Sequence, residues 1–281
     1  MAKMSMGLFL GRSFAEAALI VRAQNDSYKR VSYKRKEFET PLWDQENTKA
    51  EAIISALVAS LPGKAKRADV RVMVSLPDPL IRETILQFDS FPQNPREASD
   101  LVKWRMTADA GAQARDIHCS YQVIQETEKT VQVIGRSVDQ SVFDLTKDAI
   151  ESGGGKIARL DSWSGYHFNH WPHPRAEICI WANKEWWVLE CRHDHTGESF
   201  VASGWIDQQG SFDRIAERIT RLARAFVLKT SGKLKYVILE VSQDFERVLV
   251  SSLAKDQLLS VAGVVLDSGI ERDPSFLVAL P

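Results

Sequence analysis

Residues 7–13 read Gly7-Leu8-Phe9-Leu10-Gly11-Arg12-Ser13, an apolar strand that runs directly into a turn. Two further strands are expected at Glu16–Arg22 and Val31–Phe38, because apolar and polar residues alternate there on either side of a polar, turn-forming segment. A helix is expected over Asn47–Leu61, where apolar residues recur at helical spacing, and a buried strand over Val70–Leu76. The first part of the chain therefore reads β-β-β-α-β.

The second half of the chain repeats this order. Its expected elements are three strands at Glu177–Trp181, Trp186–Cys191 and Ser199–Ser203, a helix at Phe212–Leu228, a strand at Tyr236–Val241, a helix at Phe245–Leu253 and a short strand at Gly263–Leu266. The order β-β-β-α-β-α thus occurs twice without visible sequence identity. We therefore expect an α/β protein of two lobes built from duplicated units.

An additional module interrupts the first copy. Its expected elements are a strand at Ile81–Phe88, a helix at Pro95–Ala108, a hairpin formed by Ser120–Gln125 and Thr130–Arg136, and a helix at Val138–Glu151 that ends at three glycines. We divide the chain into a first lobe (residues 1–80), an inserted α+β module (81–155), a connection that completes the first lobe (156–175) and a second lobe (176–281).

Composition restricts the class of protein and its partners. Hydrophobic residues make up 44% and charged residues 26% of the 281, an ordinary globular composition, and 36 Lys and Arg balance 37 Asp and Glu, which argues against a nucleic-acid partner. No stretch approaches the roughly 18 apolar residues of a membrane span, and the N-terminus lacks a signal-peptide pattern. Three cysteines, Cys119, Cys179 and Cys191, lie in apolar strands and suggest buried thiols in a reducing compartment. We expect a soluble, cytoplasmic protein.

The first turn of each half lacks the residues that hold a phosphate. In a fold of this kind that turn would hold a metal-bound phosphate, but Phe9 precedes the first turn and Trp181 lies in the second, Ile180–Lys184. A Mg²⁺-nucleotide requires hard oxygen ligands and accessible backbone N–H groups, so carboxylates and glycines recur in such turns. Aromatic side chains supply neither. We interpret both turns as degenerate sites of a nucleotide-binding architecture.

Two other candidate sites have ordinary alternatives. The turn Gly11-Arg12-Ser13 either holds an anion through its backbone N–H groups and the Arg12 guanidinium or is a simple hairpin turn. His167, His170 and His173 recur every three residues, but prolines interrupt any helix that would align them for a tetrahedral metal. We expect no metal site.

Aromatic and basic residues of the second half also allow two interpretations. Trp181, Trp186, Trp187 and Trp205 either fill the place of a nucleotide or form ordinary core. The helix Phe212–Leu228 carries arginines beside its apolar stripe, which is typical of a core-packed helix and also of a helix that lies on a membrane surface.

Several segments together resemble the PilM family. They are Val72–Pro77, Arg82–Phe88, a proline-started helix that contains Trp104, and Ser120–Val123 with the hairpin strand and glycine-ended helix that follow it. PilM proteins are actin-like cytoplasmic components of type IV pilus assembly. The same fold forms the cytoplasmic part of GspL-type proteins of type II secretion, and FtsA of cell division is a more distant relative. The resemblance implies an actin-like (ribonuclease H-like) two-lobe fold with a nucleotide cleft.

The same resemblance implies that this cleft has lost its ligands. PilM proteins carry an Asp-x-Gly turn at the start; here Gly11 matches the glycine, but Phe9 stands where the aspartate should be. The second phosphate turn and the adenosine-contacting turn lack the family's glycines as well. We therefore expect no catalytic residue and no cofactor, with ATP and Mg²⁺ disfavoured. The degenerate cleft positions are Phe9, Gly11, Arg12, Ser13, Trp181, Ala182, Asn183 and Ser242.

By resemblance, the expected function is that of a non-enzymatic assembly protein at the bacterial inner membrane. It would bind the cytoplasmic N-terminal tail of a PilN-like bitopic partner, relay contact to a motor ATPase, and reach the membrane through its partners. The alternatives are an ATP-binding enzyme with its metal ligand elsewhere and an FtsA-like filament-forming protein. The expected partner-binding residues are Val72, Val74, Ile85, Leu101, Trp104 and Arg105.

Overall fold

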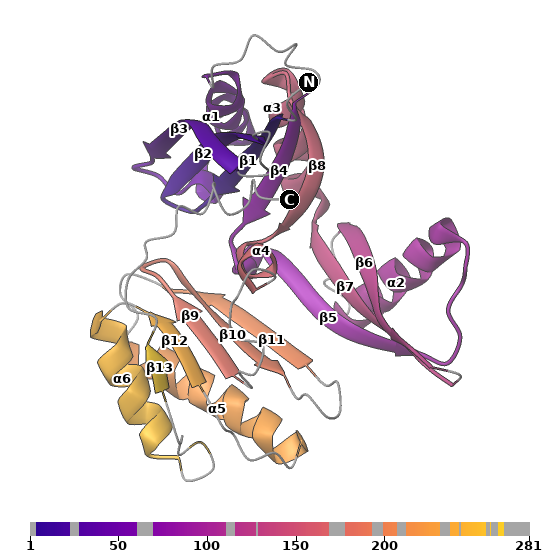
Figure 1. Ribbon diagram of the computed structural model, residues 1–281, viewed down its shortest axis with the longest axis vertical. Coiled ribbons are helices and arrows are strands. Elements are labelled where there is room, and N and C mark those ends of the chain that lie inside the picture. Colours follow the sequence, from indigo (N-terminus) through magenta and orange to yellow (C-terminus); the bar gives the residue numbers. More distant parts are fainter. Residues whose placement is uncertain are drawn as a thin grey trace. The chain divides into compact units, whose positions relative to one another are not determined.

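The computed structural model describes residues 4–22, 28–60, 70–110, 116–127, 129–168, 178–192, 199–206, 212–230, 237–241, 243–256, 259 and 264–266. These residues form two compact units (Figure 1). The described residues of Met1–Arg82 and Phe88–His170 belong to the first unit, and those of Glu83–Gln87 and Trp171–Ile270 belong to the second.

The first unit contains a five-stranded sheet with the strand order β3-β2-β1-β4-β8. Its strands are β1 (Met4–Leu10), β2 (Phe14–Arg22), β3 (Tyr28–Glu37), β4 (Arg71–Leu76) and β8 (Lys156–Ser162). The first three strands pair as antiparallel neighbours, whereas β4 runs parallel to both β1 and β8. The expected three-strand start is therefore present, and β1 lies at the centre of the sheet.

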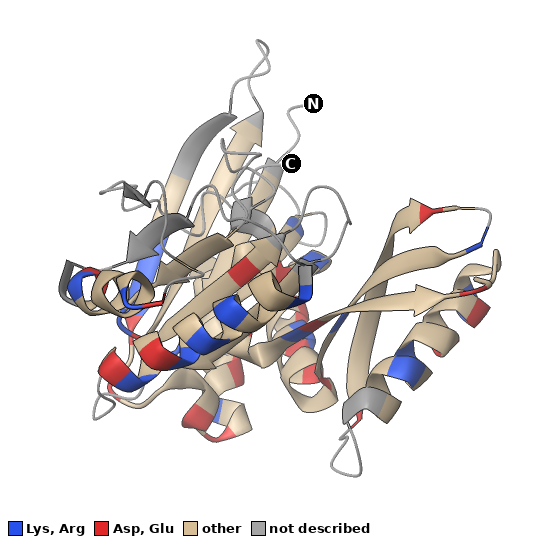
Figure 2. Ribbon diagram, turned by 90° about the horizontal axis from the view of Figure 1, so that it is seen from below, with Lys and Arg blue, Asp and Glu red and all other residues tan. Residues whose placement is uncertain are grey.

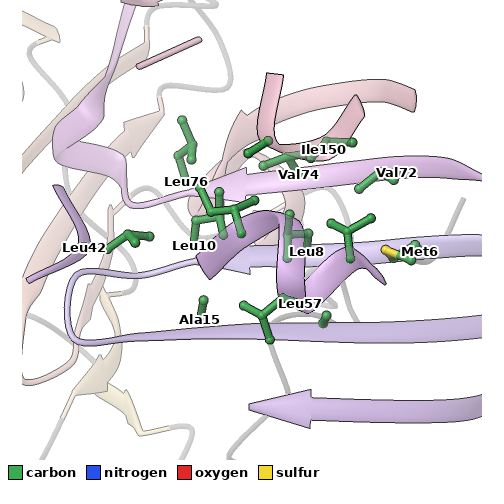
Figure 3. Close-up of a cluster of buried hydrophobic side chains, with 14 of the residues drawn as sticks. Met6, Leu8, Leu10, Ala15, Leu42, Leu57, Val72, Val74, Leu76 and Ile150 are labelled. Atoms are coloured by element: carbon green, nitrogen blue, oxygen red, sulfur yellow. The ribbon is translucent and has the colours of Figure 1, made fainter. Parts of the chain in front are cut away.

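Two helices cover one face of this sheet. They are α1 (Asn47–Ser60) and α3 (Gln140–Ser152), which pack against each other. Strand residues such as Leu8, Val74 and Leu76 point at this face and meet Leu57 of α1 and Ile150 of α3 in the core (Figure 3). Because successive side chains of a strand alternate between faces, every second residue of β1 and β4 enters this core.

The second unit repeats the sheet order as β11-β10-β9-β12-β13. Its strands are β9 (Ile178–Ala182), β10 (Trp186–Arg192), β11 (Ser199–Trp205), β12 (Val237–Val241) and β13 (Val264–Leu266). Helices α5 (Phe212–Thr230) and α6 (Gln243–Ala254) supply the core of one face. The two units thus share one topology, so the predicted duplication is confirmed.

The inserted module is a three-stranded sheet with one helix. It contains β5 (Ile81–Phe88), α2 (Pro95–Ala110), β6 (Ile117–Glu126) and β7 (Val131–Asp139), with the strand order β5-β7-β6. Ala98, Val102 and Met106 of α2 are buried against the sheet. A Cβ atom on Gly135 of β7 would lie 2.7 Å from Met106 Sδ, so the glycine lets the helix approach closely.

The structure differs from the expected boundary of this module at α3. That helix was counted in the module, yet its residues Ala149 and Ile150 lie in the core of the first unit beside α1. The segment 156–162, expected as part of a connection, is the edge strand β8 of the same sheet. The insertion therefore lies between β4 and α3.

Three short helices were not expected: η1 (Leu42–Asp44), η3 (Asp78–Leu80) and α4 (Trp163–Phe168).

Candidate functional site

A row of five side chains crosses the first sheet where β1 reaches its turn. The strand register pairs Arg35 with Glu16, Glu16 with Phe9, Phe9 with Ser75, and Ser75 with Asp161. All five stand on the face opposite α1 and α3, because their sequence neighbours in β1 and β4 enter the helix-covered core. We call these residues the cross-sheet row. It contains position 9, where the resemblance to the PilM family implies an aspartate.

The aromatic ring of Phe9 fills the space at the centre of the cross-sheet row. Its side chain is fully buried, and its ring centroid lies 5.4 Å from that of Phe14. A Cβ atom on Gly11 would lie 2.7 Å from the carbonyl oxygen of Phe14 and 2.9 Å from Cε1 of Phe9, so the turn closes directly on the ring. The space beside the turn is therefore occupied by the chain itself.

The remaining groups of the first turn make structural contacts. The carbonyl oxygens of Arg12 and Ser13 accept the N–H groups of Leu42 and Phe38, both at 2.7 Å. The Arg12 guanidinium lies 3.5 Å from the Asp44 carboxylate. These contacts tie the turn to Phe38, directly after β3, and to η1, and they favour the simple-turn interpretation of residues 11–13 over an anion site.

A carboxylate does lie next to Phe9, but it is already engaged. Glu16 is buried, and its Oε1 accepts hydrogen bonds from the Tyr33 hydroxyl and Arg35 Nη1, both at 2.8 Å. Burial alone would lower the pKa of Arg35, yet the charge and hydrogen bond of Glu16 raise it above its ordinary value. Sequence reasoning missed Glu16, although it is the one charged residue in the apolar run 14–21.

Two further buried carboxylates lie at the ends of β4 and β8. Asp161 pairs with Arg159 at 2.7 Å and Arg136 at 3.4 Å, and its Oδ1 accepts the Ser162 N–H at 2.9 Å. Asp78 accepts the backbone N–H of Ser164 at 3.2 Å as well as its hydroxyl, and so caps the start of α4. Asp78 was not singled out in the sequence, since this contact joins residues that are 86 positions apart.

The turn of the second unit is closed in a different way. Asn183 Oδ1 accepts the backbone N–H groups of Glu185 at 2.7 Å and Trp186 at 2.9 Å, an Asx-type turn. The Asn183 N–H donates to the carbonyl oxygen of Trp186 at 3.1 Å. Backbone N–H groups that could face a phosphate are therefore bonded to the chain's own carboxamide.

The tryptophans divide between the two faces of the second sheet. Trp181 and Trp186 have ring centroids 5.1 Å apart, and Trp205 lies edge-on to Trp186 at 6.4 Å. Trp187, on the opposite face of β10, belongs to the core under α5 and α6. The ordinary-core interpretation is therefore correct for Trp187, whereas the other three form an aromatic cluster beside the turn.

The predicted partner-binding residues divide between the core of the first unit and the inserted module. Val72 and Val74 have no exposed surface and lie in the first core, so their assignment to a partner surface is wrong. The strand that carries them, β4, is paired on both sides and has no free edge for a peptide. Ile85 and Leu101 are half-buried, whereas Trp104 is 63% exposed and Arg105 is exposed. Ser242, the remaining predicted cleft position, lies outside the described residues.

Neither a cluster of metal ligands nor a membrane-spanning helix occurs in the residues that the structure describes. These contain no group of three or more His, Cys, Asp or Glu side chains that could hold a metal ion. Of the clustered histidines, His170 and His173 fall outside them. None of the helices described is long and apolar enough to cross a membrane. The three cysteines are free thiols, and burial raises the pKa of Cys119 to about 11.

Comparison with known proteins gives matches only among solved structures, since no known sequence family and no curated protein matches. The chain aligns over 98% of its length with 96% of a chain of a PilM–PilN type IV pilus biogenesis complex, with a TM-score of 0.61 and 16% identity. The cytoplasmic domain of EpsL, an inner-membrane component of the type II secretion system of Vibrio cholerae, matches 92% of this chain and 98% of its own, with a TM-score of 0.50 and 13% identity.

A protein from Bacteroides thetaiotaomicron with an actin-like ATPase fold and unknown function matches 94% of this chain and 90% of its own, with a TM-score of 0.57 and 12% identity. The chain has the actin-like fold. At these identities the likeness concerns the fold, and at that level the resemblance to PilM and to the cytoplasmic part of GspL-type proteins is confirmed.

Proposed function

We propose that this protein is a non-enzymatic adaptor in the inner-membrane platform of a bacterial type IV pilus or type II secretion machine. One observation carries the proposal: in an actin-like fold, both turns that would hold phosphate are filled by the chain's own side chains. Phe9 occupies the first turn, and Asn183 takes the backbone N–H groups of the second.

The chemistry of nucleotide binding supports this reading. A phosphate that entered the second turn would have to displace two hydrogen bonds made by Asn183. In the first turn, a metal would meet an apolar ring and a glutamate whose charge is balanced by Arg35. Such a scaffold can still present surfaces to partners, because its lobes are held by their own cores.

For the partner, we propose the cytoplasmic N-terminal tail of a PilN-like bitopic protein, with contact relayed to a motor ATPase. The solved PilM structure is a complex with PilN, which supports this choice. We propose that the tail pairs with β5, an outer strand of its three-stranded sheet, by backbone hydrogen bonds, because β4 is paired on both sides. Helix α2 of the same module would supply side chains for contact with the peptide, namely those of Leu101, Trp104 and Arg105.

Titration calorimetry tests the proposal with two ligands. The tail peptide of a PilN-like protein is expected to bind at micromolar concentration, and Mg·ATP is expected to show no binding. Trp104→Ala should weaken peptide binding at least about tenfold, since exposed tryptophans often dominate an interface. Phe200→Ala, at an exposed aromatic of the second unit, is the matched control.

Other outcomes of the same experiments would favour the alternatives. Micromolar affinity for Mg·ATP would reverse the ranking in favour of an ATP-binding enzyme. Sedimentation velocity that reveals polymers growing with protein concentration would favour an FtsA-like filament.

A further inference from the structure

The outward side of α5 carries a straight stripe of exposed residues. Arg214, Arg218, Arg221, Ala225 and Leu228 are all exposed, and Leu228 retains 59% of its surface. At about 100° per residue, these five lie within roughly 40° of one line along the helix, over a rise of about 21 Å. We call them the α5 stripe. It places three cations and then an apolar end along one side of the helix.

The other side of α5 cannot reach a partner. Ala216, Ile219, Ala223 and Phe226 are buried in the core of the second unit. The core-packing interpretation of this amphipathic helix is therefore confirmed. Any docking by α5 must use the α5 stripe and leave the apolar side in place.

The charge of α5 is concentrated and positive. The helix carries five basic residues and two acidic ones, in a chain whose formal net charge is −1 (Figure 2). Exposed Glu217 and Arg224 flank the stripe on one side, and Arg224 pairs with Asp256 at 3.4 Å. Within the described part of the chain, none of the three stripe arginines makes an ion pair, and Arg218 lies over the ring of Trp187 with Cζ 5.5 Å from its centroid.

The fold itself does not require these arginines. Helix α1 takes the place in the first unit that α5 takes in the second, following the third strand and preceding the fourth. Of its five exposed residues, Asn47, Thr48, Lys49, Ala52 and Ala56, only Lys49 carries a charge. The cations of the α5 stripe are thus a feature of this helix and not of its position.

We propose that the α5 stripe docks onto the anionic headgroups of a lipid bilayer. Guanidinium groups bind phosphate through paired hydrogen bonds, so three of them in line suit a surface of phosphodiesters. A bilayer is flat over the length of the stripe, and Leu228 continues the line with an apolar side chain that can enter the interfacial region. This contact goes beyond the adaptor role, because it places the protein on the membrane without any partner.

Vesicle co-sedimentation of the full chain tests this proposal. The protein alone is expected to bind phosphatidylcholine vesicles that contain phosphatidylglycerol, and not vesicles of phosphatidylcholine alone. Added salt should weaken the binding. Each basic residue near an anionic surface contributes about fivefold, so R214Q/R218Q/R221Q should lose about a hundredfold in affinity. Leu228→Ser should lose a few-fold.

A matched control removes the same charge elsewhere. K103Q/K129Q/K147Q neutralises three exposed lysines outside the second unit and should bind as the wild type does. Circular dichroism verifies that each variant is folded. The proposal is overturned if the wild type does not bind anionic vesicles or if the arginine variant binds them as tightly as the wild type. It is also overturned if the lysine variant loses as much affinity for the vesicles as the arginine variant. Binding to soluble polyglutamate but not to vesicles would also overturn it and would indicate an acidic protein partner. The vesicle experiment contains no PilN-like tail peptide, so its result does not depend on the adaptor role. Either proposal can therefore fail while the other holds.

Discussion

At the scale of single residues, Phe9 is the fully buried aromatic residue of the cross-sheet row. It stands in the middle of the cross-sheet row, between Glu16 on one side and Ser75 on the other. Each of the two carboxylates of the row pairs with an arginine: Glu16, next to Phe9, pairs with Arg35, and Asp161, beyond Ser75, pairs with Arg159. The apolar ring therefore separates two ion pairs, whereas the buried hydroxyl oxygen of Ser75 has no hydrogen-bond partner among the described residues.

Phe9→Asp should destabilise the protein without creating a nucleotide site. Loss of the buried ring costs about 3–5 kcal/mol of unfolding free energy, and the new carboxylate lies beside Glu16. Urea unfolding measures the loss, and Phe9→Leu, which keeps an apolar side chain, should lose much less. Mg·ATP should still fail to bind, because Asn183 continues to occupy the second turn. Tight binding of Mg·ATP to this variant would show that the rest of the site is intact.

Asn183 gives a second test at this scale. Asn183→Ala removes the acceptor of two backbone N–H groups and should lower the unfolding free energy by about 1–2 kcal/mol. Asn183→Asp retains an acceptor oxygen for both N–H groups, so its unfolding free energy should stay within a few tenths of a kcal/mol of the wild type. Thermal unfolding of the two variants checks this pair. Equal losses would contradict the role assigned to the side-chain oxygen.

At the scale of elements, the sequence predicts whether a segment is a helix or a strand more accurately than it predicts which elements that segment packs against. The spacing of apolar residues in α1 and α5 predicts both helices, because periodicity is a local property of the chain. The same spacing predicts that α3 is a helix, but it does not indicate which elements α3 packs against. For this reason the sequence places Ile150 of α3 in the inserted module, whereas the structure places it in the core of the first unit. Glu16 and Asp161 stand in one row only because strand register, a tertiary property, brings together β2, β1, β4 and β8.

The packing of α3 on α1 makes Gly153 sensitive to substitution. A Cβ atom there would lie 2.7 Å from Cβ of Val58 and 3.0 Å from the carbonyl oxygen of Ser55, both on α1. Gly153→Ala should therefore wedge the helices apart and lower the unfolding free energy by about 1–3 kcal/mol. Ser152→Ala, at the exposed preceding position, should be close to neutral in the same thermal unfolding experiment. A neutral Gly153→Ala would contradict this packing.

At the scale of the whole molecule, one topology is used twice, but the two turns are closed by different chemistry. The first turn is filled by an apolar ring, whereas in the second a carboxamide satisfies backbone donors. A single reversion therefore cannot restore both phosphate contacts. Under the adaptor role proposed above, neither turn needs to admit a phosphate.

Hydrogen exchange distinguishes the two possible placements of α3. Helices α1 and α3 share one large core with β1 and β4, whereas α2, β6 and β7 bury few apolar side chains, among them Val102, Met106 and Val133. Cooperative units exchange together, and units with smaller cores open at lower free energy. In mild denaturant, the amides of α3 should therefore exchange with those of α1 and β4, and later than those of α2 and β6. Exchange of α3 together with α2 would instead place the helix in the inserted module, as its position in the sequence suggested.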